Sequence, residues 1–235
     1  MPSPATLAAR DITSARTLGS ATEQLHDVTL AFEPATFHLL LGGPNSGRNL
    51  LLRLLGLLEA PDSGDILLQG ESTREWTEDR RIDTRSRHFG FVFEAPFLLP
   101  TFNVVENIAM PLFKLTEATP EQAREETRRV LDHVGMADAA DFSVESLPLW
   151  AQQRVALARA LVTRPQALFV ENLDALAQDG DLIALLELLS ATRRSLGCCI
   201  VATAASHDIV HFANRVVQMD EGRVVRDWHP GGLLS

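Results

Sequence analysis

Short runs of apolar residues recur along this chain, and residues that favour turns separate them. Apolar and polar residues alternate over residues 25–32 (LHDVTLAF), which predicts an edge strand that ends before Pro34. Continuous apolar runs at residues 37–41 (FHLLL) and 167–170 (ALFV) predict strands that are buried on both faces. Similar patterns predict further strands over residues 65–70, 88–94 and 199–204.

Helical periodicity fills the intervals between these strands. Leucines predict a helix over residues 51–59, and an amphipathic pattern predicts another over 181–195. The polar stretch 71–87 predicts loop and surface helix. Further elements are expected as a helix over 152–162, a short helix over 207–214 and a hairpin over 215–225. Strands that alternate with helices predict an α/β fold with a mostly parallel sheet.

Residues 95–150 have a different character and predict a helical insertion. Its first part is interrupted by prolines, namely Pro96, Pro100 and Pro111. Further on, Thr119 is a predicted N-cap, Pro120 suits the first helical position, and Gln122 completes a capping box. Gly135 is expected to end this helix.

Composition narrows the class of protein. In 235 residues, 46% hydrophobic and 22% charged residues are typical of a globular protein with a substantial core. The net charge of −10 and the scattered basic residues argue against a nucleic-acid partner. Adjacent Cys198 and Cys199 lack metal-site spacing and are expected on a buried strand. No signal peptide and no apolar run of about 18 residues is visible, so we expect no direct membrane span.

A glycine-rich segment follows the first buried strand and precedes the first helix. Its residues 42–49 (GGPNSGRN) keep both glycines of the P-loop pattern G-x-x-x-x-G-K-[ST], Gly42 and Gly47. Arg48 stands at the lysine position and Asn49 at the hydroxyl position. Loop amides can hold phosphate, but neither replacement is conservative for phosphate or metal binding. The candidate phosphate-binding residues are Gly42, Pro44, Asn45, Ser46, Gly47, Arg48, Asn49 and Leu50.

Four segments carry a resemblance to a known family: GGPNSGRNLLLRLLGLLEAPDSGDILLQG, HFGFVFEAPFLLPTFNVVENIAMPL, QQRVALARALVTRPQALFVENLDAL and ATAASHDIVHFANRVVQMDEGRVV. The chain resembles the nucleotide-binding subunits of ABC transporters, most of all those of lipoprotein-release and macrolide-export systems. The resemblance implies an α/β fold with a P-loop (RecA-like) core, a mostly parallel sheet, an N-terminal antiparallel β part and a helical subdomain. The core would comprise residues 1–94 and 151–235, and the helical subdomain residues 95–150.

The resemblance also assigns the family's site positions to residues of this chain. The aromatic residue that stacks on adenine is missing, because residues 12–24 contain no aromatic side chain. The Q-loop glutamine is Glu94 here. The signature, Leu-Ser-Gly-Gly-Gln in the family, reads Leu147, Pro148, Leu149, Trp150 and Ala151. A tryptophan at a glycine position would block close approach to a phosphate, although Gln152, Gln153 and Arg154 match the family.

The Walker B motif of the family should end in Asp-Glu, and here it ends in Glu171 and Asn172. Asn172 replaces the carboxylate that polarises the attacking water, and an amide does not accept a proton at neutral pH. The D-loop, residues 174–178, also departs from the family pattern, while the switch histidine is present as His207. The candidate ligands for Mg²⁺ are Asn49, Glu94 and Glu171.

Alternative roles stay open for several of these residues. Arg48 is expected either to bind phosphate or to fill the phosphate site by pairing with Glu171 or Glu94. His207 is either the catalytic switch or a cap for the helix that it precedes, and Trp150 is expected to pack. Apolar residues that either contact a membrane partner or pack inside the helical subdomain are Phe97, Leu98, Leu99 and Phe102.

The replaced positions favour one function over two alternatives. We expect a degenerate ABC-type subunit that docks on a transmembrane permease and does not hydrolyse ATP. The alternatives are a regulatory subunit that holds ATP without hydrolysing it, and a transport ATPase with weak activity; only these two would use ATP or Mg²⁺. An intact ABC ATPase is a second candidate partner, as a heterodimer. The resemblance implies a peripheral position on the cytoplasmic face of the cell membrane, held by the partner.

Overall fold

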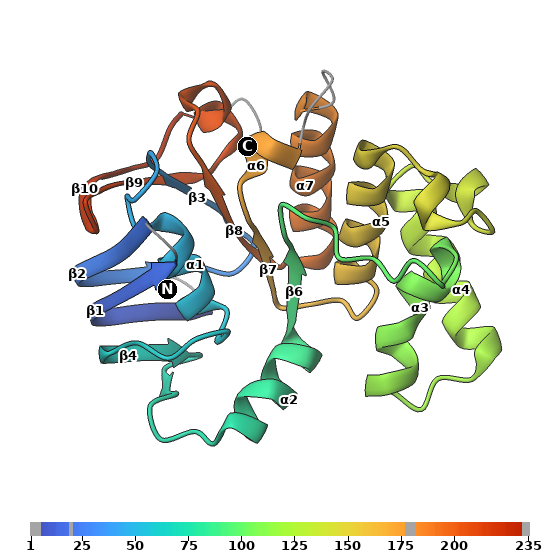
Figure 1. Ribbon diagram of the computed structural model, residues 1–235, viewed down its shortest axis with the longest axis horizontal. Helices are drawn as coiled ribbons and strands as arrows, with labels where there is room; N and C mark the ends of the chain where they lie inside the picture. The colour runs from blue at the N-terminus through green and yellow to red at the C-terminus, as the bar shows by residue number, and fades with distance from the viewer. Residues whose placement is uncertain (1–5, 19–20, 177–181, 232–235) are drawn as a thin grey trace.

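The structure, a computed structural model, describes residues 6–18, 21–176 and 182–231. Two β-sheets and a set of helices form this part of the protein (Figure 1). The smaller sheet has the order β2-β1-β4-β5, with the bounds Ala21–Phe32 (β2), Leu7–Leu18 (β1), Ser63–Leu68 (β4) and Glu71–Ser72 (β5). The larger sheet has the order β10-β9-β3-β8-β7-β6, with the bounds Arg223–Trp228 (β10), Arg215–Asp220 (β9), Phe37–Leu41 (β3), Cys199–Ala204 (β8), Ala167–Val170 (β7) and Phe89–Val92 (β6).

Strand direction separates the two sheets. All pairs in the smaller sheet are antiparallel, whereas in the larger sheet only the β9–β10 pair is antiparallel. This confirms the predicted α/β fold with a mostly parallel sheet and an N-terminal antiparallel part. The helices have the bounds Arg48–Leu55 (α1), Glu78–His88 (α2), Val104–Leu115 (α3), Pro120–His133 (α4), Leu149–Leu161 (α5), Leu173–Leu176 (α6) and Leu182–Leu196 (α7). Single 3₁₀ turns lie at Ala137–Ala139, Val144–Ser146 and His207–Phe212.

The larger sheet is the middle layer of the protein. Alternate residues of a strand face opposite sides, so Leu40 of β3 packs in the cluster with α1 and the smaller sheet, whereas Leu39 and Leu41 pack in the cluster with α3, α4, α5 and α7. Figure 1 shows the smaller sheet and α1 to the left of the larger sheet and α3, α4 and α5 to its right. This burial on both faces agrees with the continuous apolar run of β3.

The first strand of the smaller sheet was not predicted, and the second begins at Ala21 rather than at residue 25. In β1 the buried positions change phase, because Ala9 and Ile12 are both buried with two exposed residues between them. A register shift at this point marks a β-bulge, with Asp11 at φ 52°. The bulge hides the period-two pattern by which a strand is recognised. The edge position predicted for residues 25–32 is confirmed.

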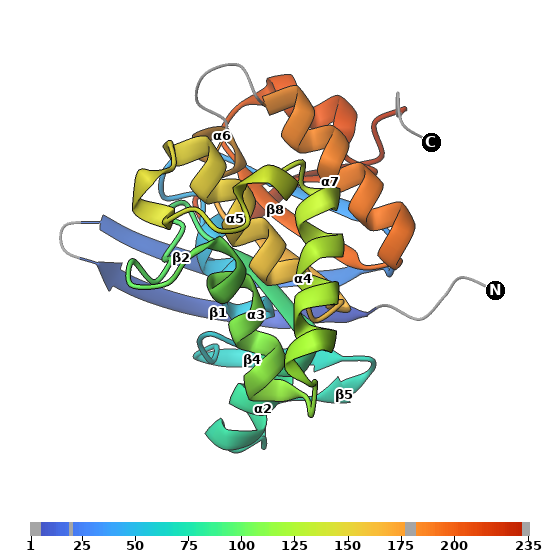
Figure 2. The same cartoon turned by 90° about the vertical axis from the view of Figure 1, so that its right-hand side faces the viewer.

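Two helices of residues 95–150 lie side by side, α3 and α4 (Figure 2). The capping box predicted at Thr119 and Gln122 is present at the start of α4, and Gly135 (φ 68°) follows the helix end. The expectation that Pro111 interrupts the chain is wrong, because Pro111 lies inside α3. A capping box formed by Asn103 and Glu106 anchors that helix, so the loss of one backbone donor at the proline is tolerated.

Two further predicted helices are present in the structure, but they begin earlier in the sequence than predicted. The helix predicted from residue 51 begins at Arg48, and the helix predicted from residue 152 begins at Leu149. Residue 181, the predicted start of α7, lies outside the described residues. Within the described ranges, no helix is both long enough and apolar enough to cross a membrane.

Candidate functional site

The candidate site lies where β3 ends and α1 begins, and the P-loop joins these two elements. The N–H of Gly42 donates to the backbone oxygen of Ala204 at 3.1 Å, which ties the loop to the end of β8. Asn45 (φ 63°) and Gly47 (φ 84°) are left-handed, and Gly47 is the N-cap of α1. A Cβ at Gly47 would collide with the backbone oxygen of Gln24, so this position requires glycine. The backbone therefore keeps the strand–turn–helix form in which a helix N-terminus can face an anion.

The Arg48 side chain turns back into this loop. Its Nη1 donates to the backbone oxygens of Gly42 and Gly43, the latter at 2.5 Å, and its Nη2 donates to Oδ1 of Asn172 at 3.1 Å. The side chain is buried, and its Nε has no hydrogen-bond partner among the described residues. Burial is the largest influence on Arg48 and lowers its pKa, although nearby carboxylates oppose this effect.

Asn172 connects the P-loop to the ends of two neighbouring strands. Its N–H donates to Oγ1 of Thr203 at 2.9 Å, and its Nδ2 donates to Oε2 of Glu94 at 2.7 Å. Its Oδ1 accepts from Arg48 and also from Nδ2 of Asn49, the latter at 3.2 Å. We call this continuous set of side-chain contacts the Arg48–Asn172–Glu94 chain. It crosses from the P-loop to the carboxyl ends of β7 and β6.

The expected ion pair between Arg48 and Glu171 or Glu94 is wrong for the residues that the structure describes. The carboxylate of Glu94 instead accepts a hydrogen bond from Asn172, and the guanidinium of Arg48 donates hydrogen bonds to loop carbonyls. The backbone oxygen of Glu94 accepts from Nε2 of Gln153 at 2.6 Å, which attaches α5 to this corner. Glu171 is half-buried, and burial raises the pKa of its carboxyl group despite the nearby guanidinium of Arg53.

Two of the three candidate metal ligands, Asn49 and Glu94, hydrogen-bond to the side chain of Asn172. Asn49 directs its Nδ2 toward Asn172, and its Oδ1 is buried without a partner. Glu94 is exposed and accepts from Asn172, while Glu171 lies at the end of β7. Within the described ranges, no group of three or more His, Cys, Asp and Glu side chains is arranged to hold a metal ion.

The five residues at the signature position span the start of α5, which begins at Leu149. Leu147 and Ala151 are buried, and Pro148 occupies the N-cap without a side-chain cap bond. The Trp150 ring is 41% exposed, and the guanidinium of Arg154 lies over it at 5.5 Å from the ring centroid. Trp150 therefore packs only partly, since one side of it remains open to solvent.

His207 begins the 3₁₀ turn after β8. The cap of this turn is Ser206, whose side chain accepts from the N–H of Asp208 at 3.1 Å, so the interpretation of His207 as the cap is wrong. His207 itself is exposed. The carboxylate of Asp174 accepts from the backbone N–H groups of Ala205 and Ser206, which fixes the loop before His207. The D-loop residues 177 and 178 lie outside the described residues.

The chain is similar to known proteins over most of its length. Residues 25–172 match the protein-family model described as ABC transporter. The chain belongs to the ABC transporter family. It is 34% identical over 209 residues to the lipoprotein-releasing system ATP-binding protein LolD of Bordetella pertussis, covering 87% of this chain and 88% of that protein. LolD of Shewanella denitrificans is 31% identical over 218 residues, covering 91% and 87%.

Solved structures support the fold of this ABC cassette. The dimeric structure of MJ0796, a bacterial ABC transporter cassette, matches with a TM-score of 0.86 and 23% identity, covering 97% of this chain and all of that one. The cbiO1 protein from Clostridium perfringens, part of the ABC transporter complex cbiONQ, matches with a TM-score of 0.85 and 21% identity, covering 97% and 90%. The predicted P-loop core with its antiparallel and helical parts is thus confirmed as the fold of an ABC cassette.

The cassette has an apolar groove of about 350 Å³ beside β6 and α3. Its lining includes Leu58, Phe91, Phe93, Met110, Pro111 and Lys114. The rings of Phe93 and Phe97 meet edge to face at 5.7 Å, which connects the groove to the segment predicted to contact a partner. In that segment Phe97 is 66% exposed, whereas Leu98 is half-buried and packs on the core. Leu99 and Phe102 are also exposed, at 37% and 36%.

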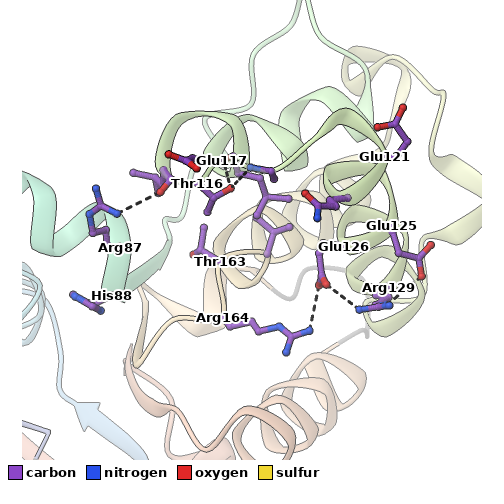
Figure 3. A pocket seen from close by; sticks show the side chains of 15 residues that line it. Arg87, His88, Thr116, Glu117, Glu121, Glu125, Glu126, Arg129, Thr163 and Arg164 are labelled. Atoms are coloured by element: carbon purple, nitrogen blue, oxygen red, sulfur yellow. Dashed lines mark hydrogen bonds and ion pairs between the residues drawn. The ribbon is translucent and has the colours of Figure 1, made fainter.

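A larger cavity of about 880 Å³ lies at the end of the larger sheet that is opposite the P-loop (Figure 3). His88 and Arg164, which line it, precede β6 and β7, so the cavity lies near the amino ends of these strands. Glu126 of α4 forms ion pairs with Arg129 at 2.8 Å and with Arg164 at 3.2 Å. This cavity is separate from the P-loop, which lies at the carboxyl ends of the strands.

Proposed function

We propose that this ABC cassette docks on a transmembrane partner and does not hydrolyse ATP. The observation that carries the proposal is the Arg48–Asn172–Glu94 chain. It joins the positions of the phosphate-binding lysine, the water-polarising carboxylate and the Q-loop glutamine into one hydrogen-bonded set. These side chains form hydrogen bonds with one another. They are therefore not positioned to bind a triphosphate and an attacking water.

The chemistry of these side chains supports the absence of hydrolysis. The amide of Asn172 does not accept a proton at neutral pH, and removal of a general base typically costs about 10²–10⁴-fold in rate. Arg48 donates two hydrogen bonds to loop carbonyls and one to Asn172. Few of its N–H groups therefore remain for a transferring phosphoryl group. The residues assigned to the signature, with exposed Trp150 among them, lack the glycines that allow close approach to a phosphate.

The partner assignments rest on family membership and on the exposed apolar surface. MJ0796, which has a similar fold, forms a dimer. The cbiO1 protein, which also has a similar fold, is part of an ABC transporter complex. We assign residues 95–150 as the helical subdomain, and Phe97, Leu99, Phe102 and the adjoining groove as the surface that receives a transmembrane permease. An intact ABC ATPase would complete the assembly as a heterodimer. We propose that the partner holds the chain on the cytoplasmic face of the cell membrane.

The test is steady-state hydrolysis of Mg-ATP by the purified chain, with the Asn172→Ala variant purified in parallel. We expect the same background rate in both preparations. Turnover in the unmodified chain that disappears in the variant would refute the proposal, because it would show that this site hydrolyses ATP. A variant of exposed Asp138, Asp138→Asn, serves as the control for changes caused by substitution alone.

A second function, a regulatory subunit that holds a nucleotide, is favoured by a separate observation. The P-loop backbone keeps its left-handed Gly47, its anchoring to Ala204 and the free N-terminus of α1. Loss of ATP hydrolysis at this site therefore does not imply loss of nucleotide binding.

A further inference from the structure

Two adjoining cavities extend along α4. The cavity of about 880 Å³ shares Glu126 and Arg164 with a second cavity of about 230 Å³, which reaches Leu196 at the end of α7. We call these two cavities the α4 trough. The trough also adjoins the apolar groove beside β6, because Leu115 and Thr163 line both. A long depression of this kind suits a segment of polypeptide better than a compact ligand, which one enclosed cavity would hold.

The floor of the α4 trough is apolar. Leu112 and Val162 are buried there, and Leu115 and Ala118 are half-buried. Ala118 packs against the main core, so this part of the floor is anchored to the fold. Apolar side chains that are only partly buried gain free energy when a partner removes them from water. The trough can therefore receive apolar side chains.

Four carboxylates line one side of the trough, on α4 and in the loop before it: Glu117, Glu121, Glu125 and Glu126. Glu117 and Glu121 are exposed, and neither side chain forms a hydrogen bond or an ion pair with another described residue. Unpaired carboxylates attract positive charge, and the net charge of −10 on the whole chain acts in the same direction. The trough therefore favours a positively charged occupant.

The arginines of the trough are paired with carboxylates of this chain. Arg87 pairs with Asp83 at 2.7 Å, and Arg129 and Arg164 pair with Glu126 at 2.8 and 3.2 Å. Figure 3 shows Arg164 directed toward Glu126 on α4. An acidic occupant would have to compete with these carboxylates for the arginines, whereas a basic occupant finds Glu117 and Glu121 unpaired.

The position of the trough favours a membrane protein as the source of the basic segment. Cytoplasmic loops of membrane proteins carry an excess of lysine and arginine. The trough continues, through Leu115 and Thr163, into the groove that we assign to the permease. A permease segment that leaves this groove would thus enter the acidic trough directly.

We propose that the α4 trough binds a basic, amphipathic segment of the permease. Its apolar side chains cover the floor around Leu115, and its lysine or arginine side chains pair with Glu117 and Glu121. This rests on the proposed function in one respect, the docking of the chain on a permease. It adds a second contact, of stated chemistry, to the docking surface around Phe97.

The experiment is fluorescence anisotropy of a labelled synthetic peptide titrated with the full chain. The probe peptide has leucine at helical spacing (i, i+3, i+4, i+7) and lysine elsewhere, and a second peptide has glutamate in place of each lysine. We expect the lysine peptide to bind at least about tenfold more tightly, a difference of about 1.4 kcal/mol. Added salt should weaken it by screening the exposed charges. Equal affinities, or no binding of the lysine peptide, would overturn the proposal.

Paired variants separate the trough from general attraction to an acidic protein. Glu117→Gln combined with Glu121→Gln should weaken the lysine peptide about three- to tenfold, as expected for the loss of two exposed ion pairs. Glu75→Gln combined with Glu145→Gln removes the same charge at exposed positions outside the trough and should change the affinity less than about twofold. Equal weakening by the two double variants would refute the site.

Leu115→Ala tests the apolar floor. It should weaken the lysine peptide at least about threefold, because the peptide then covers less apolar surface. An unchanged affinity would show that the peptide binds to surface charges alone, and would refute binding in the trough. A thermal melt of each variant shows whether it is folded, and the charge variants test the proposal even if Leu115→Ala unfolds the protein.

Recovery of the chain with membranes that contain the permease separates this inference from the proposed function. If Phe97→Ala reduces recovery and the double variant of Glu117 and Glu121 does not, docking stands and the trough is refuted. If the double variant also reduces recovery, the trough is supported as a second contact. If recovery of the unmodified chain does not depend on the permease, the proposed docking and the trough both fail.

Discussion

Buried His38 on β3 should make the stability of this protein depend on pH in the mildly acidic range. The ring is 0% exposed, contacts Phe32 edge to face at 5.1 Å, and accepts from the N–H of Glu33 at 3.1 Å through Nε2. Its Nδ1 has no partner among the described residues. Burial lowers the pKa of His38 from 6.5 to about 4, so the ring is neutral in the folded protein at neutral pH. The perturbation is the substitution His38→Gln, which keeps an acceptor but does not titrate.

The magnitude follows from the two pKa values. Because the folded-state pKa is the lower one, the unfolded chain binds a proton first as the pH falls. The stability associated with a neutral His38 is complete above pH 6.5, declines between 6.5 and about 4, and is lost below that. At about 1.4 kcal/mol for each pKa unit, the total is on the order of 3 kcal/mol. The hydrogen bond with the Glu33 backbone raises the pKa of His38, and it and the charges of Arg215, Asp227 and His229 have smaller effects than burial.

The assay is urea unfolding of the wild type and His38→Gln at several pH values from 7.5 to 4. The variant should be less stable at pH 7.5 by about 1–2 kcal/mol, from the altered buried contact. The difference in unfolding free energy should then shrink or reverse as the pH falls, by on the order of 3 kcal/mol. His211→Gln, at an exposed histidine, should follow the wild-type curve. Parallel curves for wild type and His38→Gln would refute the assignment of a neutral buried ring.

Three further substitutions test local features of the fold and of the proposed docking surface. Gly47→Ala should destabilise the protein by about 1–3 kcal/mol in urea unfolding, because φ is 84° and a Cβ would collide with Gln24; an unchanged midpoint would contradict this. Thr119→Ala should cost about 1 kcal/mol by removing the N-cap of α4, whereas Ser146→Ala, in a short 3₁₀ turn, should cost less. Phe97→Ala should cost about 1 kcal/mol at most, because the side chain is 66% exposed and loses only its edge-to-face contact with Phe93. It should reduce the fraction of protein recovered with membranes that contain the permease, and unchanged recovery would remove Phe97 from the docking surface.

The parts of the fold that the sequence predicted are those with uninterrupted local patterns. β3 was predicted at its observed bounds, because its five consecutive residues, four of them apolar, are all buried. The start of α4 was predicted because Thr119, Pro120 and Gln122 interact within one turn. β1 was missed because a bulge breaks its alternation, and α3 was missed because a capping box compensates for its internal proline.

The site was predicted in its residues but not in its contacts. Gly42, Gly47, Arg48 and Asn49 were recognisable by their spacing. The partner of Arg48 was not, because Asn172 is 124 residues away in the sequence and several carboxylates, including those of Asp174 and Glu171, also act on the guanidinium. Thr203, which holds the backbone of Asn172, carries no local signal; only the parallel pairing of β7 with β8 brings it there. Contacts between strand ends therefore need the sheet register as well as the sequence.

The Arg48–Asn172–Glu94 chain also makes three positions far apart in the sequence depend on one another. The three residues come from distant parts of the gene, but each satisfies the hydrogen-bonding needs of another. Asn172→Glu would place a carboxylate against Glu94, and loss of the Arg48 contact would leave Asn49 as the donor to Oδ1 of Asn172. Neighbours that share contacts are not independent in their effects on stability. The stability costs of substitutions at positions 48, 94 and 172 should therefore not add, so the effect of changing one of these residues depends on which residues stand at the other two positions.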